Sequence, residues 1–149
     1  NQSQLFVHSL NMYHLEYVHE GMKISKLDTL AEEFIRSHGA KPAFKGYMGF
    51  PSTLCVSVDD AVVHGIPGDT YLKNGQIVGI DCGAELNGYF GDHAKSFPVG
   101  NINENKKKLL DVTRESLIKA IDKAISLFFR TKIRNLRFFM QLATNTMTN

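Results

Sequence analysis

Residues 76–100 read QIVGIDCGAELNGYFGDHAKSFPVG and carry the clearest structural signal in the chain. Asn87-Gly88 separates two strand-like runs, 77–86 and 89–99. Asn-Gly is typical of a two-residue type I′ turn, because both central residues of this turn need a positive φ. The sequence therefore predicts an antiparallel hairpin whose register is set by this turn.

In that register Asp81 pairs with Ala94, and Gly83 pairs with Asp92. The two carboxylates then project from one face as diagonal neighbours, with Cβ atoms roughly 7–8 Å apart or somewhat less. A slip of one residue would place them on opposite faces. A buried carboxylate is neutralised, paired or bound to metal, so this pair is a candidate site for one or two divalent cations. Two simpler interpretations stay open: both side chains are exposed on an edge strand, or one of them pairs with Lys95.

Helix and strand signals lie on both sides of the hairpin. Ser25 followed by Asp28 resembles a capping box, and Gly39 is placed to end a helix in the left-handed conformation. The sequence predicts a helix from about Lys26 to His38 and a strand at Thr53–Val58. The apolar stripe of that helix consists of Leu27, Leu30, Ala31, Phe34 and Ile35.

A second helix is expected to start after Asn103 as its N-cap and to run to about Ile125. Its expected buried side consists of Leu109, Val112, Ser116, Ala120 and Ala124.

The composition is that of one ordinary globular domain of 149 residues, with 43% hydrophobic and 21% charged residues. A net charge of +2 is too small to indicate nucleic acid or an acidic membrane as a partner. The sequence has no apolar run of the ~18 residues that a membrane span needs and no visible secretory signal. Its two cysteines, Cys55 and Cys82, do not make a disulfide scaffold. We expect a soluble cytoplasmic protein with reduced thiols.

The two ends differ in composition from the middle. Residues 1–14 contain no charged side chain other than histidine, and no acidic residue follows Asp122. We therefore expect a domain at residues 15–125, with atypical ends at 1–14 and 126–149 that are disordered or out of frame. A competing interpretation takes the basic and aromatic residues of the last segment as a nucleic-acid or membrane patch.

Two further groups are candidates for a site. His64 stands alone between Val63 and Gly65, where it is either an ordinary loop residue or a residue that contacts substrate and moves a proton. Phe44, Tyr47 and Phe50 recur at three-residue intervals, and with Cys55 they form either a small apolar pocket or an aromatic cluster that closes the core.

Four motifs in order carry a resemblance to a known family. They are Lys41-Pro-Ala-Phe-Lys-Gly-Tyr-Met-Gly-Phe-Pro51, Val63-His-Gly-Ile-Pro67, Ile80-Asp-Cys-Gly83 and Gly88-Tyr-Phe-Gly-Asp-His-Ala-Lys-Ser-Phe97. Together they resemble the type I methionine aminopeptidases over residues 18 to about 125. The resemblance implies an α+β fold, the N-terminal half of a pita-bread fold, with a curved antiparallel sheet covered by helices on one face.

The resemblance also implies roles for the candidate residues. Asp81 and Asp92 would be two of five metal ligands in a site for two divalent ions (Mn, Fe, Co or Zn), with Asp92 bridging both. His64 would contact the substrate near the scissile peptide. The pocket for the methionine side chain would be formed by Phe44, Tyr47, Phe50, Cys55 and His64. The reaction would remove an N-terminal methionine from proteins and peptides when the next residue is small, without nucleic acid or membrane as a partner.

The sequence also departs from the family. The remaining three ligands, a His and two Glu, belong to a second half that these 149 residues do not contain. We therefore expect weak or no metal binding, no activity of the chain alone, and self-association through the exposed half-site face. Lys95 and Ser96 stand where other residues are expected. Two other functions stay open: a pita-bread module that binds a protein partner without catalysis, and an exopeptidase that acts before proline.

Overall fold

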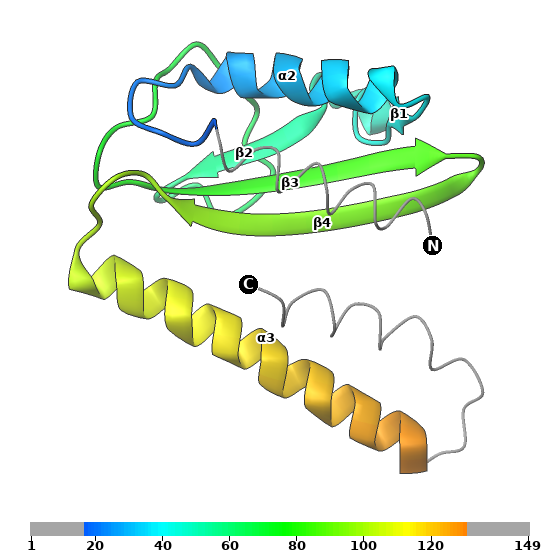
Figure 1. Cartoon of the computed structure of the whole chain (residues 1–149), viewed down its shortest axis with the longest axis vertical. Coiled ribbons are helices and arrows are strands. Elements are labelled where there is room, and N and C mark those ends of the chain that lie inside the picture. Colours follow the sequence, from blue (N-terminus) through cyan, green and yellow to red (C-terminus); the bar gives the residue numbers. More distant parts are fainter. Residues whose placement is uncertain (1–16, 131–149) are drawn as a thin grey trace. The chain divides into compact units, whose positions relative to one another are not determined.

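The structure is a computed structural model that describes residues 17–130, with side chains up to residue 125. The chain divides between Asn103 and Glu104 into two units, and each is described by itself. The first unit is built on a four-stranded antiparallel sheet (Figure 1). The central strand is β3 (Ile77–Leu86), and β4 (Tyr89–Pro98) pairs with it along one side. Along its other side β3 pairs with two shorter strands, β1 (Lys41–Pro42) and β2 (Leu54–Val58).

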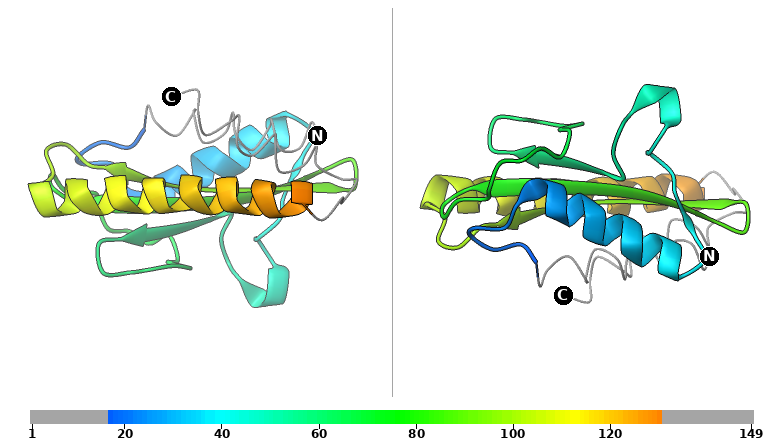
Figure 2. Two further views of the ribbon diagram at one scale, coloured as in Figure 1. Left: turned by 90° about the horizontal axis from the view of Figure 1, so that it is seen from below. Right: turned by 90° about the horizontal axis from the view of Figure 1, so that it is seen from above.

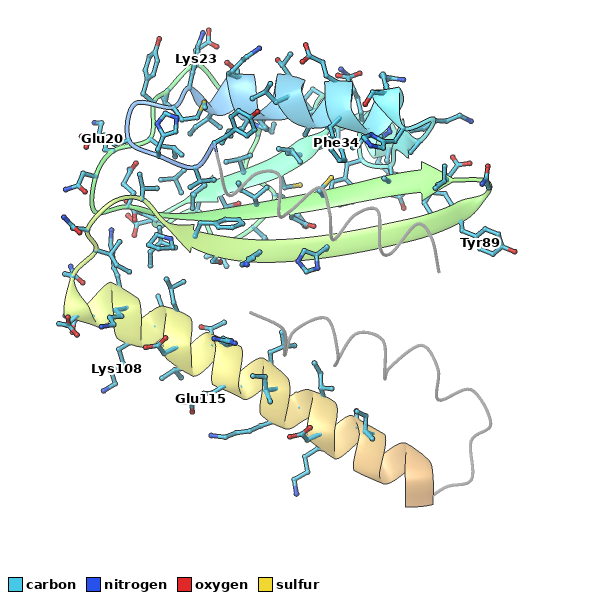
Figure 3. The ribbon with its side chains drawn as sticks, viewed as in Figure 1. Glu20, Lys23, Phe34, Tyr89, Lys108 and Glu115 are labelled. Atoms are coloured by element: carbon cyan, nitrogen blue, oxygen red, sulfur yellow. The ribbon has the colours of Figure 1, made fainter. Side chains whose placement is uncertain are left out.

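The predicted hairpin is confirmed residue by residue. Leu86 pairs with Tyr89, and the register runs without a bulge to the pair of Ile77 and Pro98. Asn87 and Gly88 have φ values of 54° and 79°, as a type I′ turn requires. Tyr89 points away from the sheet beside this turn (Figure 3).

One helix, α2 (Ile24–Ser37), covers one face of this sheet (Figure 2). Leu27, Ala31 and Ile35, which the sequence places on one stripe, are fully buried. They meet alternate residues of the strands, because successive side chains of a strand point to opposite faces. The strand residues in this core are Leu54, Val56, Val78, Ile80, Cys82, Ala84 and Phe97. The expected α+β fold with helical cover on one face is confirmed in this unit.

The predicted capping box is wrong. The helix begins at Ile24, so Ser25 lies inside it, and no side chain caps its N-terminus. Thr70 and Gly68 supply carbonyl groups to the N–H groups of Ile24 and Ser25, each at 2.9 Å. The N–H groups of the first turn therefore donate to carbonyl groups of a segment distant in sequence. Asp28 does not cap the helix and can accept hydrogen bonds from other segments. The other end follows the prediction, since Gly39 has a φ of 74° directly after the helix.

The second unit contains α3 (Glu104–Arg130), which starts after Asn103 as predicted and runs past the expected end. Leu109 and Val112, on the predicted buried side of this helix, expose 60% and 50% of their surfaces within the described residues. None of the described helices combines the length and the apolar character that a membrane span requires. The expected atypical ends, 1–14 and most of 126–149, lie outside the described residues.

Candidate metal centre

The face of the sheet away from α2, which we call the open face, carries the carboxylates Asp81 and Asp92. Val78, Ile80 and Cys82 point into the core under α2, so the residues between them point to the open face. Asp81 pairs with Ala94, and Gly83 pairs with Asp92. Both carboxylates therefore stand on the open face as diagonal neighbours, in the arrangement that the turn predicted.

Asp81 is a carboxylate without a complete set of partners. Among the described residues, its Oδ1 atom is buried and accepts no hydrogen bond. Burial and then the negative charge of Asp92 raise the pKa of Asp81 to about 6. Asp92 is exposed. The two carboxylates repel each other, and one has a buried oxygen without a hydrogen bond. A divalent cation bound between them would offset the repulsion and use that oxygen.

His64 lies on a loop that closes against β2. The N–H of Val56 donates to the carbonyl of Gly65 at 2.8 Å, and the N–H of Gly65 donates to Ser57 Oγ at 3.1 Å. A Cβ on Gly65 would stand 2.2 Å from the carbonyl oxygen of Val56, so only glycine permits this approach.

The same loop brings His64 to the carboxylates. His64 is exposed and has a φ of 58°, an unusual value for a residue with a side chain. Its charge acts to lower the pKa of Asp81, against the larger effects of burial and Asp92. The structure therefore brings the three sequence-predicted residues Asp81, Asp92 and His64 to one region of the open face.

The expected pocket residues differ in their burial and in how close they lie to the two carboxylates. A Cβ on Gly83 would stand 2.5 Å from the ring of Phe44, so this ring lies on the open face beside Asp92. Cys55 pairs with Asp81 across β2 and β3 and is buried. Its burial, followed by the charge of Asp81, raises the pKa of the thiol, which keeps it neutral. Phe50 is half-buried, whereas Tyr47 exposes 70% of its surface and forms no buried wall.

Lys95 does not neutralise the negative charge of Asp81 and Asp92. It pairs with Ile80, whose side chain is in the core, so Lys95 projects from the opposite face of the sheet. Its Nζ atom lies 5.4 Å from the centre of the Phe97 ring. The alternative in which Lys95 pairs with Asp81 or Asp92 is therefore wrong.

Sequence reasoning missed Ser57, which holds the His64 loop through its hydroxyl group. Its signal was the alternation of β2, because Ser57 is two residues after Cys55 and so shares the open face. Between residues 17 and 125, no group of three or more His, Cys, Asp or Glu side chains could hold a metal ion. This part of the chain thus offers two candidate carboxylate ligands and no complete set.

Comparison with known proteins gives a consistent result. The sequence pattern of Metallopeptidase family M24 matches residues 4–127. Methionine aminopeptidase 1 of Bacillus subtilis is 52% identical over 73% of this chain and 44% of its own length. Methionine aminopeptidase of Clostridium perfringens is 53% identical over the same shares. The crystal structure of methionine aminopeptidase from Thermotoga maritima matches with a TM-score of 0.77 and 38% identity, over 80% of this chain and 48% of that one. The chain spans less than half the length of these relatives.

Proposed function

Because the chain belongs to metallopeptidase family M24, we propose that it is the N-terminal part of a methionine aminopeptidase, with residues 15–125 as this half of the domain. The observation that carries the proposal is the pair Asp81 and Asp92 on the open face, with an unused buried oxygen on Asp81. Curated relatives at about half identity are named methionine aminopeptidases. The cytoplasmic location expected from the sequence stays a prediction.

The open face supplies the residues for metal-assisted hydrolysis of a peptide bond. Asp81 and Asp92 would hold two divalent ions, Mn, Fe, Co or Zn, with Asp92 shared between them. Bound ions would acidify a water molecule and polarise the scissile carbonyl group. His64, beside Asp81 on its closed loop, would hydrogen-bond the substrate near that carbonyl group.

The substrate class is the one that the resemblance to methionine aminopeptidases implies, and the apolar residues beside the carboxylates support it. Phe44 over Gly83, with Phe50, Cys55 and Tyr47, would receive the side chain of an N-terminal methionine. Substrates would be proteins and peptides whose second residue is small. A binding module without catalysis gives no reason for the arrangement of Asp81 and Asp92, because the burial of Asp81 and its repulsion by Asp92 destabilise a sheet that does not use them.

The test is release of methionine from a Met-Ala-Ser peptide by the purified chain in Mn²⁺ or Co²⁺. Asp92→Asn removes a proposed ligand, and Asp60→Asn, an exposed loop carboxylate, is its matched control. Release that is lost in Asp92→Asn and kept in Asp60→Asn supports the proposal. Equal release by both variants contradicts it. If the chain alone releases nothing, as we expect, Mn²⁺ binding by the same three proteins decides whether it holds its part of the site.

A further inference from the structure

The loop between β1 and β2, residues 43–53, which we call the pocket loop, carries Phe44, Tyr47 and Phe50. It projects from the sheet on the side opposite α2 (Figure 2). Its own hydrogen bonds fold it on itself: Gly46 N–H donates to the carbonyl of Phe50 at 2.8 Å, and Tyr47 N–H to that of Phe44 at 3.0 Å. Within residues 17–125, its polar contacts with other elements fall near its two ends, so its position depends on those contacts.

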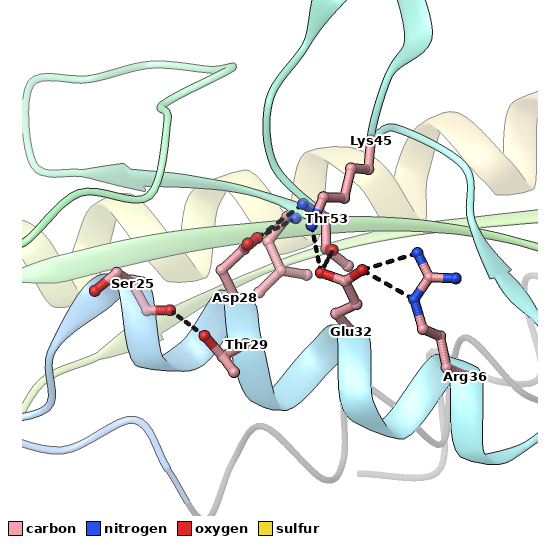
Figure 4. Close-up of polar contacts among 8 residues, drawn as sticks. Ser25, Asp28, Thr29, Glu32, Arg36, Lys45 and Thr53 are labelled. Atoms are coloured by element: carbon pink, nitrogen blue, oxygen red, sulfur yellow. Dashed lines mark hydrogen bonds and ion pairs between the residues drawn. The ribbon is translucent and has the colours of Figure 1, made fainter.

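The later end of the loop is held by Asp28 of α2. The N–H groups of Thr53 and Leu54 donate to Asp28 Oδ1 at 2.9 and 2.8 Å (Figure 4). Asp28 is half-buried, and burial raises its pKa although both N–H groups act in the opposite direction. A carboxylate placed in this position against its desolvation cost holds the point where the loop enters β2.

The earlier end is held by Glu32, one helical turn after Asp28. Glu32 Oε2 accepts from Lys45 Nζ at 2.5 Å and from Thr53 Oγ1 at 3.5 Å, while Oε1 accepts from Arg36 Nη2 at 2.8 Å (Figure 4). The hydrogen bond from Lys45 is the largest cause that holds the pKa of Glu32 below its usual value.

The ion pair between Lys45 and Glu32 differs from an ordinary surface pair, which contributes little to stability. The Glu32 side chain is only 21% exposed, both of its oxygens are used, and it belongs to a network. Residues four apart on a helix lie on the same side of it, so Asp28 and Glu32 face the loop together.

Lys45 is adjacent to Phe44, and this links the network to the open face. The Phe44 ring lies over Gly83, which pairs with the proposed ligand Asp92. Two contacts therefore hold the backbone that carries this ring: the N–H of Ala43 donates to the carbonyl of Gly83 at 2.9 Å on one side of Phe44, and Lys45 pairs with Glu32 on the other.

We propose that Asp28 and Glu32 form a two-point anchor for the pocket loop, so that residues of α2 position Phe44 over the open face. The anchor determines how the methionine side chain fits without touching it. The substrate part of this inference rests on the proposed function, whereas the anchor itself does not.

The experiment compares Lys45→Met and Glu32→Gln, which break the ion pair, with Lys45→Arg, which keeps the charge. Glu115→Gln is a matched control, since it removes the equivalent pair between Glu115 and Lys119 on α3. In each protein, nuclear Overhauser effects are measured between the Phe44 ring and Gly83, and between the methyl groups of Val56 and Ile80, which pair across the core face.

We expect the Phe44–Gly83 effect to be lost in Lys45→Met and Glu32→Gln and kept in Lys45→Arg and Glu115→Gln. The core effect between Val56 and Ile80 should stay unchanged in all four. Persistence of the Phe44–Gly83 effect in Lys45→Met and Glu32→Gln overturns the proposal. So does loss of the core effect, because the pair would then stabilise the whole fold rather than position the loop.

The release assay adds a readout of specificity. Where methionine release is measurable, Lys45→Met should reduce the preference for Met-Ala-Ser over Leu-Ala-Ser, and Lys45→Arg should keep the preference of the unaltered chain. Failure of release in the unaltered chain bears on the proposed function alone, because the ring contact is measured without substrate.

Discussion

The helix face and the open face of the sheet come from the same strands, yet their side chains have opposite character. On the helix face Val78, Ile80 and Cys82 are at most 1% exposed. On the open face, the residues between them are Gly79 and Asp81, and the carboxyl oxygen of Asp81 is buried without a partner among the described residues. One face gains stability by excluding water, and the other gives up stability to hold charge.

This difference separates the residues that fold the chain from those that we assign to chemistry. Changes on the helix face should alter the free energy of unfolding strongly and at every pH. Changes on the open face should alter it less, and in ways that depend on pH or metal.

The largest effect is expected on the helix face. Leu27→Ala should lower the free energy of unfolding by ~2–5 kcal/mol, because it removes a fully buried side chain and leaves a cavity. Val62→Ala, at a residue that is 87% exposed, should change it by less than ~0.5 kcal/mol. Urea unfolding measures both. Similar values for the two variants would contradict the assignment of the core.

A smaller effect is expected where the open face is tightly packed. Gly83→Ala should cost about 1–2 kcal/mol, because its Cβ would stand 2.5 Å from the Phe44 ring and displace it. Gly79→Ala, on the same strand and face, meets nothing closer than 3.7 Å and should change stability by less than ~0.5 kcal/mol. Urea unfolding of the two variants makes the comparison, and equal costs would show that Phe44 does not lie there.

The pH dependence of stability should come partly from Asp81. Its pKa is raised from 3.8 to about 6 on folding, so the folded state binds this proton more tightly than the unfolded state. The stabilisation is complete below pH 4 and is lost as the pH rises through about 6. Solvent reaches this half-buried group, so we expect a difference of only ~1 kcal/mol between pH 4 and pH 7.

Asp81→Asn should remove that part of the pH dependence. Urea unfolding of both proteins at several pH values, with a chelator present, measures the difference. A variant that follows the unaltered chain at every pH would show that Asp81 is not the responsible group.

The smallest effect is expected at Lys95. Since Lys95 projects from the helix face, Lys95→Met should change the Mn²⁺ affinity by less than about twofold at 0.15 M salt. Ala94→Lys would place an ammonium group on the open face opposite Asp81 and should weaken binding roughly fivefold. Calorimetric titration measures both affinities. A larger effect of Lys95→Met than of Ala94→Lys would show that Lys95, and not residue 94, lies on the face that binds Mn²⁺.

The hairpin could be predicted from the sequence because its information is local. Asn87-Gly88 sets the turn, the turn sets the register, and the register places Asp81 and Asp92 on one face. The same register places Lys95 on the other face, so it also excludes an ion pair of Lys95 with Asp81 or Asp92.

Contacts between distant segments were not predictable in this way. The capping box failed because the carbonyl groups of Gly68 and Thr70 satisfy the first turn of α2. Nothing local to Asp28 shows that it accepts from Thr53 and Leu54. The metal and substrate roles of Asp81, Asp92 and His64 stay predictions, because they depend on chemistry rather than on position alone.

The central claim is that Asp81 and Asp92 hold metal on the open face. Thermal unfolding with increasing Mn²⁺ tests it most directly, for the unaltered chain, Asp81→Asn, Asp92→Asn and the control Asp60→Asn. Because two carboxylates are an incomplete set of ligands, we expect weak binding, and we predict that Mn²⁺ at millimolar concentration slightly raises the melting temperature of the unaltered chain and of Asp60→Asn, and not that of the other two. An equal rise in all four proteins, or no rise in any, would contradict the claim.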